Sequence, residues 1–309
     1  MEQRRIGGLT VSAVGVGCNN FGGRLDAART AAVVDAALAA GINFFDTADV
    51  YGNTRSEEYL GRALKGKRAQ AVVATKFGMP VDGAQGASPA YVKQALEASL
   101  RRLDTDYIDL YQLHRADPDV PIAETLGALD DLVRAGKVRE IGCSNFTVPQ
   151  LREAAAASQG ARFVSVQNEY SLLHRDPERS VLPECERAGL AFLPFFPLAS
   201  GVLSGKYRPG QPPPPGARLA GSGALTPRFL SAANTAKAEA LRTFAESHQH
   251  TLLELAISWL ANQPAVASVI AGATSPEQVQ ANARAAGWKL TAEERAEIDR
   301  LAPLPPSPA

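Results

Sequence analysis

Residues 42–61 read INFFDTADVYGNTRSEEYLG and change abruptly from apolar to polar character. A short apolar run ends at the carboxylate of Asp46, and a polar loop then carries Tyr51. We expect a helix to begin at Ser56, whose hydroxyl can cap the first turn, with Glu57 at the positive end of the helix dipole. The segment is therefore predicted to form a buried strand, a loop and a helix. On spacing alone, Asp46 is more often a structural cap than a catalytic residue.

The rest of the chain repeats this pattern, because short apolar runs alternate with Ala-rich amphipathic segments. After a predicted hairpin over residues 2–11, strands are expected at 14–17, 44–46, 71–76, 108–114, 138–143, 163–167, 190–196 and 268–271. Helices are expected at 26–40, 56–66, 88–102, 121–135, 147–158, 177–188, 233–248 and 252–262, and two more begin near residues 275 and 291. Thr291 and Glu294 are spaced as a capping box for the last helix.

Strands separated by helices favour parallel pairing through right-handed crossovers. In a chain of 309 residues, this pattern predicts one α/β domain over residues 1–309, a (β/α)₈ TIM barrel with an N-terminal hairpin and long loops in its C-terminal half. A doubly wound open sheet is the alternative, and it requires a glycine-rich phosphate loop after an early strand. The sequence GVGCNN at residues 15–20 lacks the third glycine of that loop.

The composition is that of an ordinary folded protein, with 45% hydrophobic and 21% charged residues and a formal net charge of zero. This balance gives no reason to expect nucleic acid or an anionic membrane as a partner. No apolar leader opens the sequence, and two prolines interrupt its most apolar stretch, residues 189–203, so neither a signal peptide nor a membrane span is predicted. Three scattered cysteines are too few for a disulfide framework, which favours a cytoplasmic protein.

One long segment departs from the repeating pattern. Residues 199–234 are rich in Gly and Pro and include four consecutive prolines. Loops of this length in a compact domain are usually functional, so we expect a lid, with a loosely attached insertion as the alternative. Residues 303–309 are expected to form a loose tail.

Polar side chains capable of chemistry follow the predicted strands at the point where each strand ends. Strands two to six end, in order, in Asp46, Lys76, His114, Ser144-Asn145 and Gln167-Asn168. Each has a simple structural explanation by itself, such as a lysine reaching for water. Because the carboxyl ends of barrel strands meet at one face, we expect these groups to converge on an active site there.

Other kinds of site have weaker support. His248 and His250 have no carboxylate at ligand spacing, so no metal site is predicted. Neither Cys143 nor Cys185 has an evident base partner, and the sequence contains no nucleophile elbow and no Walker loop.

The motif Asp46-Thr-Ala-x-x-Tyr51-Gly, followed by Ser56-Glu-x-x-Leu-Gly61, resembles the signature of the aldo-keto reductases. Lys76 and His114 match the remaining catalytic positions of that family, and the resemblance extends over nearly the whole chain. The sequence PLASGVLSGKY at residues 197–207 resembles a bacterial branch that is also similar to the potassium-channel β subunits.

The resemblance implies reduction of an aldehyde or ketone with a catalytic set of Asp46, Tyr51, Lys76 and His114. Tyr51 is the implied general acid, and its unperturbed pKa of about 10 makes it a reluctant proton donor at neutral pH. Lys76, held by Asp46, is expected to lower that pKa, since one charge at about 4 Å contributes roughly 4 kcal/mol at an effective dielectric of about 20. His114 is expected to orient the substrate oxygen.

The resemblance also implies a nicotinamide cofactor, with NADPH preferred and NADH possible. Its expected contacts, besides Asp46, are Cys18, Asn19, Arg24, Ser144, Asn145, Gln167, Phe195, Phe196, Pro197, Leu198, Ala199, Ser200, Lys206, Arg218, Gly272, Thr274, Gln278 and Asn282. Many family members carry Lys at the position of Gly272 and Arg at that of Gln278, where they grip the 2′-phosphate of NADP. This chain has neither, and Ala281 replaces an acidic residue that often meets the adenine.

The substrate is expected to be a small carbonyl compound, held by Asn20, Phe21, Phe77, Met79 and Arg115. This apolar mouth fits a hydrophobic aldehyde or ketone, a sugar or a polyketide intermediate. Two alternatives to an enzyme of this kind remain: a slow regulatory subunit like the channel β proteins, and a barrel that binds a phosphorylated sugar without hydride chemistry. No oligomeric state is predicted.

Overall fold

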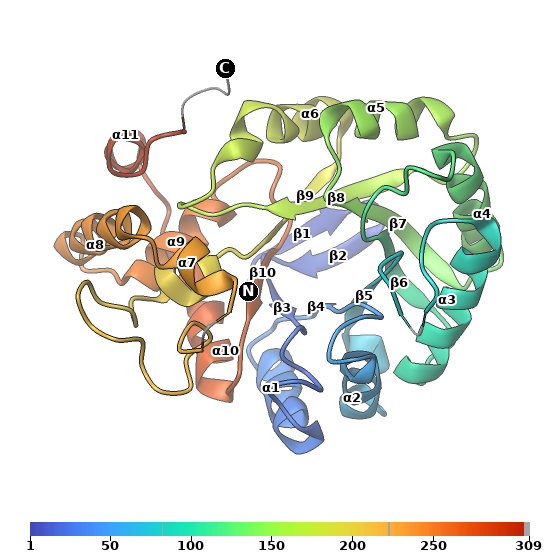
Figure 1. The fold of residues 1–309 in the computed structure, drawn as a ribbon, viewed down its shortest axis with the longest axis horizontal. Coiled ribbons are helices and arrows are strands. Elements are labelled where there is room, and N and C mark those ends of the chain that lie inside the picture. The colour runs from blue at the N-terminus through green and yellow to red at the C-terminus, as the bar shows by residue number, and fades with distance from the viewer. Residues whose placement is uncertain (82, 222, 306–309) are drawn as a thin grey trace.

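The computed structural model describes residues 1–81, 83–221 and 223–305. Its main feature is an eight-stranded sheet of parallel neighbours in the order β10-β3-β4-β5-β6-β7-β8-β9. The last strand meets the first across Phe192, whose backbone bonds to Ala265 and Ala267 just before β10. The predicted barrel is therefore confirmed, with the helices arranged around the strands (Figure 1).

All eight predicted barrel strands are present within two residues of their expected bounds. They are β3 (Val14–Gly17), β4 (Phe44–Asp46), β5 (Val72–Phe77), β6 (Ile108–Leu113), β7 (Val138–Ser144), β8 (Phe163–Glu169), β9 (Ala191–Phe195) and β10 (Val269–Gly272). The strands β4, β5 and β6 are buried along their whole length, as expected where helices cover one face and barrel side chains fill the other.

The predicted helices are also present. They are α1 (Ala27–Ala39), α2 (Arg55–Leu64), α3 (Pro89–Leu103), α4 (Ile122–Arg134), α5 (Val148–Ala157), α6 (Val181–Ala188), α8 (Ala232–Ser247), α9 (Leu252–Ala261), α10 (Pro276–Arg284) and α11 (Ala292–Leu301). Helix α6 begins four residues later than predicted, because Ser180 leaves the helical region and separates α6 from a short 3₁₀ turn, Asp176–Arg179. The capping box predicted at Thr291 and Glu294 is observed.

The expected capping role of Ser56 was wrong. Helix α2 begins at Arg55, and its N-cap residue is Thr54, in the left-handed region with φ 69°. The hydroxyl of Ser56 is buried and donates to the carbonyl oxygen of Cys18 at 2.9 Å. Its Oγ also lies 2.8 Å from Oγ1 of Thr47, so these polar partners hold it inside the barrel rim, away from the helix amides.

A hairpin closes one end of the barrel. Strands β1 (Gln3–Ile6) and β2 (Leu9–Ser12) pair antiparallel, and Figure 1 shows them lying across the middle of the ring of strands. The side chains of Ile6, Leu9 and Val11 are buried in one cluster with apolar residues from inside the barrel. This packing leaves the carboxyl end of the strands for the functional site.

The long segment that follows β9 is partly ordered into helical turns. It contains a 3₁₀ helix, Ala199–Ser204, and a short helix that the sequence did not predict, α7 (Leu225–Phe229). The ring of Phe229 packs edge-on against that of Phe196, with centroids 5.4 Å apart. The segment is thereby attached to the end of β9. Of the tail predicted at residues 303–309, residues 306–309 lie outside the described residues. Every helix in the described ranges is too short or too polar to cross a membrane.

Candidate active site

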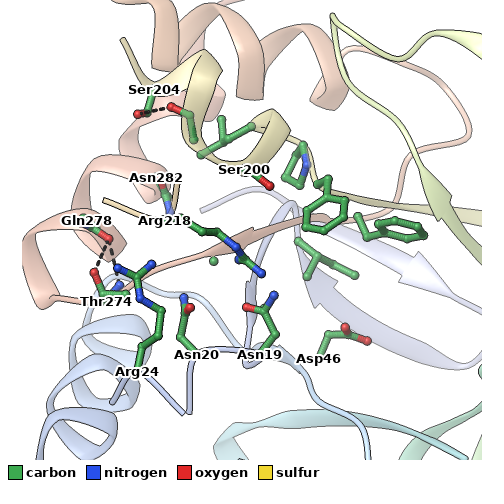
Figure 2. Close-up of a pocket in the computed structure, with 18 of the residues that line it drawn as sticks. Asn19, Asn20, Arg24, Asp46, Ser200, Ser204, Arg218, Thr274, Gln278 and Asn282 are labelled. Atoms are coloured by element: carbon green, nitrogen blue, oxygen red, sulfur yellow. Dashed lines mark hydrogen bonds between the residues drawn. The ribbon is translucent and has the colours of Figure 1, made fainter. Parts of the chain in front are cut away.

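A cavity of about 720 Å³ opens among the loops at the carboxyl end of the barrel. Figure 2 shows Asn19, Arg24 and Asp46 on one side of it and Arg218 and Ser200 on the other. The predicted site residues that line the cavity are Asn19, Asn20, Arg24, Asp46, Tyr51, His114, Arg115, Ser144, Asn145, Gln167, Phe195, Phe196, Pro197, Leu198, Ser200, Lys206, Arg218, Gly272, Thr274, Gln278 and Asn282. The fold therefore brings most of the predicted residues together around one space.

The carboxylate of Asp46 lies at the centre of a buried polar network. Its Oδ2 accepts a hydrogen bond of 2.6 Å from Lys76 Nζ, which also donates to the carbonyl oxygen of Thr47 at 2.9 Å. Its Oδ1 accepts from the side-chain amides of Gln112 at 3.1 Å and Gln167 at 2.9 Å. Because Lys76 is fully buried and Asp46 nearly so, the ion pair depends on these bonds to offset lost hydration.

Gln112 is the polar member of this network that the sequence did not single out. It lies on β6, two residues before His114. Residues two apart in an extended strand point to the same side, so Gln112 is expected on the side of His114. The strand reads IDLYQL and is buried at every position. A long polar side chain in a wholly buried strand needs an internal partner, and this signal could have identified Gln112.

Tyr51 and His114 face each other beside this network. Their rings meet edge to face, with centroids 6.0 Å apart, and Lys76 Nζ lies 5.1 Å from the centroid of the Tyr51 ring. The expected lowering of the Tyr51 pKa was wrong. Burial raises this pKa above its ordinary value of 10, and the charge of Lys76 opposes that rise without cancelling it. In this geometry Tyr51 stays a protonated phenol at neutral pH.

His114 stays uncharged over the physiological range. Burial, followed by the positive charges of Lys76 and Arg115, lowers the pKa of its imidazole to about 3. Its Nδ1 is buried and has no hydrogen-bond partner among the described residues. The backbone of the same residue is held by Asn145, whose Nδ2 donates to the His114 carbonyl oxygen at 3.1 Å. A neutral imidazole fixed in this way can give or accept a hydrogen bond with a guest in the cavity.

Three cations gather at the side of the cavity formed by the loops after β3 and β9. They are Arg24, Lys206 and Arg218, and none of them has a carboxylate of this cavity as an ion-pair partner in the described part of the chain. Burial and the charge of Arg24 lower the pKa of both Lys206 and Arg218. Arg24 also donates to the carbonyl oxygen of Gly216 at 2.5 Å, which links its loop to the long segment. The three positive charges repel one another, and an anion bound among them would relieve this repulsion.

Several residues predicted to form the substrate pocket do not line the cavity. Phe21 and Phe77, expected in the substrate pocket, are instead fully buried in the main core, where Phe77 stacks on Tyr111 with centroids 4.6 Å apart. Met79 does not line the cavity either. Alternation along the strand explains Phe77, because it follows the inward-facing Lys76 and so points outward, toward the helices.

Two predicted cofactor contacts, Cys18 and Ala199, are fully buried and also lie outside the lining. The thiol of Cys18 bonds to the carbonyl oxygen of Val16 at 3.6 Å. The residues that line the cavity but were not predicted as site residues are Gly17, Gly201, Ser204, Pro214, Pro215, Gly216, Ala217, Leu253, Ile270 and Ala281. Most belong to the long segment, whose path over the barrel has no periodic signal in the sequence.

Within the described residues, no group of three or more His, Cys, Asp or Glu side chains is arranged to hold a metal ion. Buried side-chain atoms without a hydrogen-bond partner there include Ser200 Oγ and Asn168 Oδ1. Ser200 lies on the cavity wall, where an unpaired hydroxyl marks a place for a polar guest.

Comparison with known proteins identifies the family. Residues 13–303 match the aldo/keto reductase family, and the chain belongs to this family of oxidoreductases. It is 36% identical over 314 residues to "Probable aldo-keto reductase 1" of Glycine max, and this match covers 96% of this chain and 87% of the relative. It is also 35% identical over 298 residues to "Probable voltage-gated potassium channel subunit beta" of Arabidopsis thaliana, and this match covers 92% of this chain and 91% of the relative.

Solved structures agree with this assignment. The glycerol dehydrogenase of Gluconobacter oxydans matches with a TM-score of 0.85 and 30% identity, covering 99% of this chain and 98% of that chain. An aldo-keto reductase of Klebsiella pneumoniae, solved in complex with NADPH, matches with a TM-score of 0.79 and 30% identity, covering 100% of this chain and 98% of that chain.

Proposed function

We propose that this protein reduces an aldehyde or ketone to an alcohol with NADPH, using Tyr51 as the general acid. The observation that carries the proposal is that the Tyr51 ring, at the wall of the cavity, lies close to both the imidazole of His114 and the ammonium of Lys76. In such a group the phenol can protonate a carbonyl oxygen, while the neighbouring ammonium and imidazole assist it.

The cavity wall fits a phosphorylated dinucleotide. Arg24, Lys206 and Arg218 supply the cations that phosphate groups need, and their mutual repulsion favours an anion between them. The unpaired Ser200 hydroxyl and the amide of Asn145 can hydrogen-bond to phosphate and carboxamide groups. The Klebsiella pneumoniae relative was solved with NADPH, which supports the same class of cofactor for this chain.

The roles of the protein side chains follow from their geometry. When bound, NADPH supplies a hydride to the carbonyl carbon of the substrate. Tyr51 donates its phenolic proton to the carbonyl oxygen, which completes the alcohol. Lys76 stabilises the resulting tyrosinate through its charge, and Asp46 holds Lys76 in place. Neutral His114 donates a hydrogen bond that orients the carbonyl oxygen toward Tyr51.

We attribute the preference for NADPH over NADH to Arg24. The usual basic grip on the 2′-phosphate is missing because Gly272 and Gln278 carry no charge, and the Gln278 amide oxygen accepts from the Thr274 backbone at 2.9 Å. Figure 2 shows Arg24 extending toward Thr274 and Gln278, where its guanidinium can serve a phosphate instead. Arg24→Gln should raise the KM for NADPH at least tenfold more than that for NADH, and an equal rise for both would contradict this role.

The proposal is tested by following NADPH oxidation at 340 nm with a panel of aldehydes and ketones. Tyr51→Phe should lower kcat by about 10² to 10⁴, the usual contribution of a positioned general acid. Tyr59→Phe removes a phenol from the same helix–loop unit outside the cavity and should retain full activity. Equal activity of the two variants would rule out Tyr51 as the acid.

A second candidate function is a cofactor-binding regulatory subunit with slow turnover. It is favoured by the 35% identity to the Arabidopsis thaliana channel subunit. The two functions differ in rate, because enzymes typically turn over at about 1 to 10³ per second. Tight retention of NADPH, with turnover far below this range on every carbonyl compound of the panel, would favour the regulatory function.

A further inference from the structure

The positive charges of the cavity fall into two separate groups. Arg24 follows β3 and Lys206 and Arg218 follow β9, and these two strands flank β10. Arg115 follows β6, which lies opposite β10 in the ring, with β3, β4 and β5 between them on one side and β7, β8 and β9 on the other. Arg115 is therefore placed across the cavity from the three cations that suit a phosphorylated cofactor.

Arg115 adjoins the reacting end of the site. It is the residue directly after His114, and its charge is among the causes that lower the pKa of that imidazole. Lys206 and Arg218 instead respond to the charge of Arg24. Arg115 is not among the charges that shift the pKa of Lys206 or Arg218, and of these two cations Arg218 also interacts with the phenol of Tyr51.

Among the described residues, no carboxylate forms an ion pair with Arg115. Asp46 is a carboxylate that lines the cavity, but its charge is already paired with that of Lys76. Asp117, the acid closest to Arg115 in its own loop, accepts at Oδ2 from the amide of Ala87 at 2.8 Å and at Oδ1 from that of Asp119 at 3.0 Å. No ion pair or side-chain hydrogen bond of Arg115 occurs within residues 1–81, 83–221 and 223–305.

We propose that Arg115 binds an anionic group, a carboxylate or a phosphate, carried by the carbonyl substrate. This inference rests on the proposed carbonyl reduction and names the class of substrate. A guanidinium presents a planar pair of N–H donors that matches two oxygens of a carboxylate or phosphate. An anion held there lies next to His114, so the carbonyl of a short substrate can reach Tyr51. The sequence suggested a hydrophobic aldehyde or ketone, a sugar or a polyketide intermediate, and an anionic group on the substrate was not part of that expectation.

The test uses pairs of aldehydes that differ only in charge. The 2-, 3- and 4-formylbenzoates are compared with the corresponding formylbenzamides, and glyceraldehyde 3-phosphate with glyceraldehyde, by NADPH oxidation. We expect kcat/KM to be about tenfold or more higher for the anionic member of at least one pair, the usual advantage of a charge-assisted hydrogen bond. The pair that shows the advantage distinguishes a carboxylate from a phosphate. The advantage should shrink as ionic strength rises, because Arg115 is exposed to solvent.

Variants assign this advantage to the side chain. Arg115→Gln should reduce the anionic-to-neutral ratio of kcat/KM to near one, and Arg115→Lys should retain part of it. Arg62→Gln, which removes an exposed arginine of α2 away from the cavity, should leave the ratio unchanged.

Two results would overturn the inference alone: equal turnover of the charged and neutral members by the unaltered protein, or an equal loss for both members in Arg115→Gln. Absence of NADPH oxidation with every compound would overturn the proposed function and this inference with it.

Discussion

Lys76 Nζ lies 2.6 Å from Asp46 Oδ2, and the lysine side chain has no exposed surface. The pair joins β5 to β4, and the two glutamine amides on Asp46 Oδ1 extend the network to β6 and β8. A buried ion pair of this kind is held by geometry more than by net attraction, and breaking one side leaves an uncompensated charge.

Lys76→Met should therefore lower the free energy of unfolding by about 3 to 5 kcal/mol, because Asp46 stays buried without its counter-ion. Lys93→Met is the matched control, since Lys93 forms an exposed pair with Asp131 at 2.9 Å. That loss should be under about 1 kcal/mol. Urea unfolding at pH 7 measures both, and similar losses would show that burial of the Lys76 pair carries no special weight.

Removing His114 should make the fold less sensitive to acid. The folded-state pKa of about 3 lies below the ordinary 6.5, so the unfolded chain takes up this proton first as the pH falls. Stability is thus lost between about pH 6.5 and pH 3. The difference in unfolding free energy between pH 7 and pH 4 should be smaller in His114→Gln by about 2 to 3 kcal/mol. An unchanged difference would contradict the low pKa.

Asp49 should oppose folding at alkaline pH. Its side chain is almost wholly buried, and Oδ1 has no hydrogen-bond partner in the described ranges. Burial, and next the charge of Glu57, raise its pKa from 3.8 to about 7, against the opposing effects of the Val50 amide, Arg102 and Lys76. The folded protein then holds a proton that the unfolded chain releases, so stability falls as the pH rises from about 4 to 7.

Asp49→Asn mimics the protonated acid and removes this dependence. Relative to the unaltered protein, the variant should gain up to about 4 kcal/mol of unfolding free energy at pH 8.5 and almost nothing at pH 4. Urea unfolding at the two pH values gives both differences. A gain of the same size at both pH values would point to packing instead of titration.

Two helical glycines should respond to alanine in opposite directions. At Gly61, where α2 approaches α3, an added Cβ would lie 2.4 Å from the Leu103 carbonyl oxygen. Gly61→Ala should therefore cost about 1 to 3 kcal/mol through displacement of the helices. Gly127 in α4 has no atom within 4 Å of its Cβ position, so Gly127→Ala should stabilise by about 0.5 to 1 kcal/mol. Thermal unfolding of both variants measures the contrast, and a shift in the same direction would contradict it.

The sequence by itself determined the order of strands and helices and the rim on which the catalytic candidates lie. Apolar residues repeat at one interval in strands and at another in amphipathic helices, so both elements can be recognised in the sequence. A carboxylate at the end of a buried strand, such as Asp46, can be recognised in the same way. The capping of α11 at Thr291 was also readable, because it depends on residues three apart.

Only the tertiary structure decided which side chains share an environment. Ser56 looked like a helix cap until its buried partners were known, and Phe77 looked like a pocket residue until its outward side became clear. Tyr51 kept a raised pKa because desolvation outweighed the single charge that the motif supplied. Burial, and the lack of an ion-pair partner for Arg115 among the described residues, depend on how distant parts of the chain pack together, which no local pattern encodes.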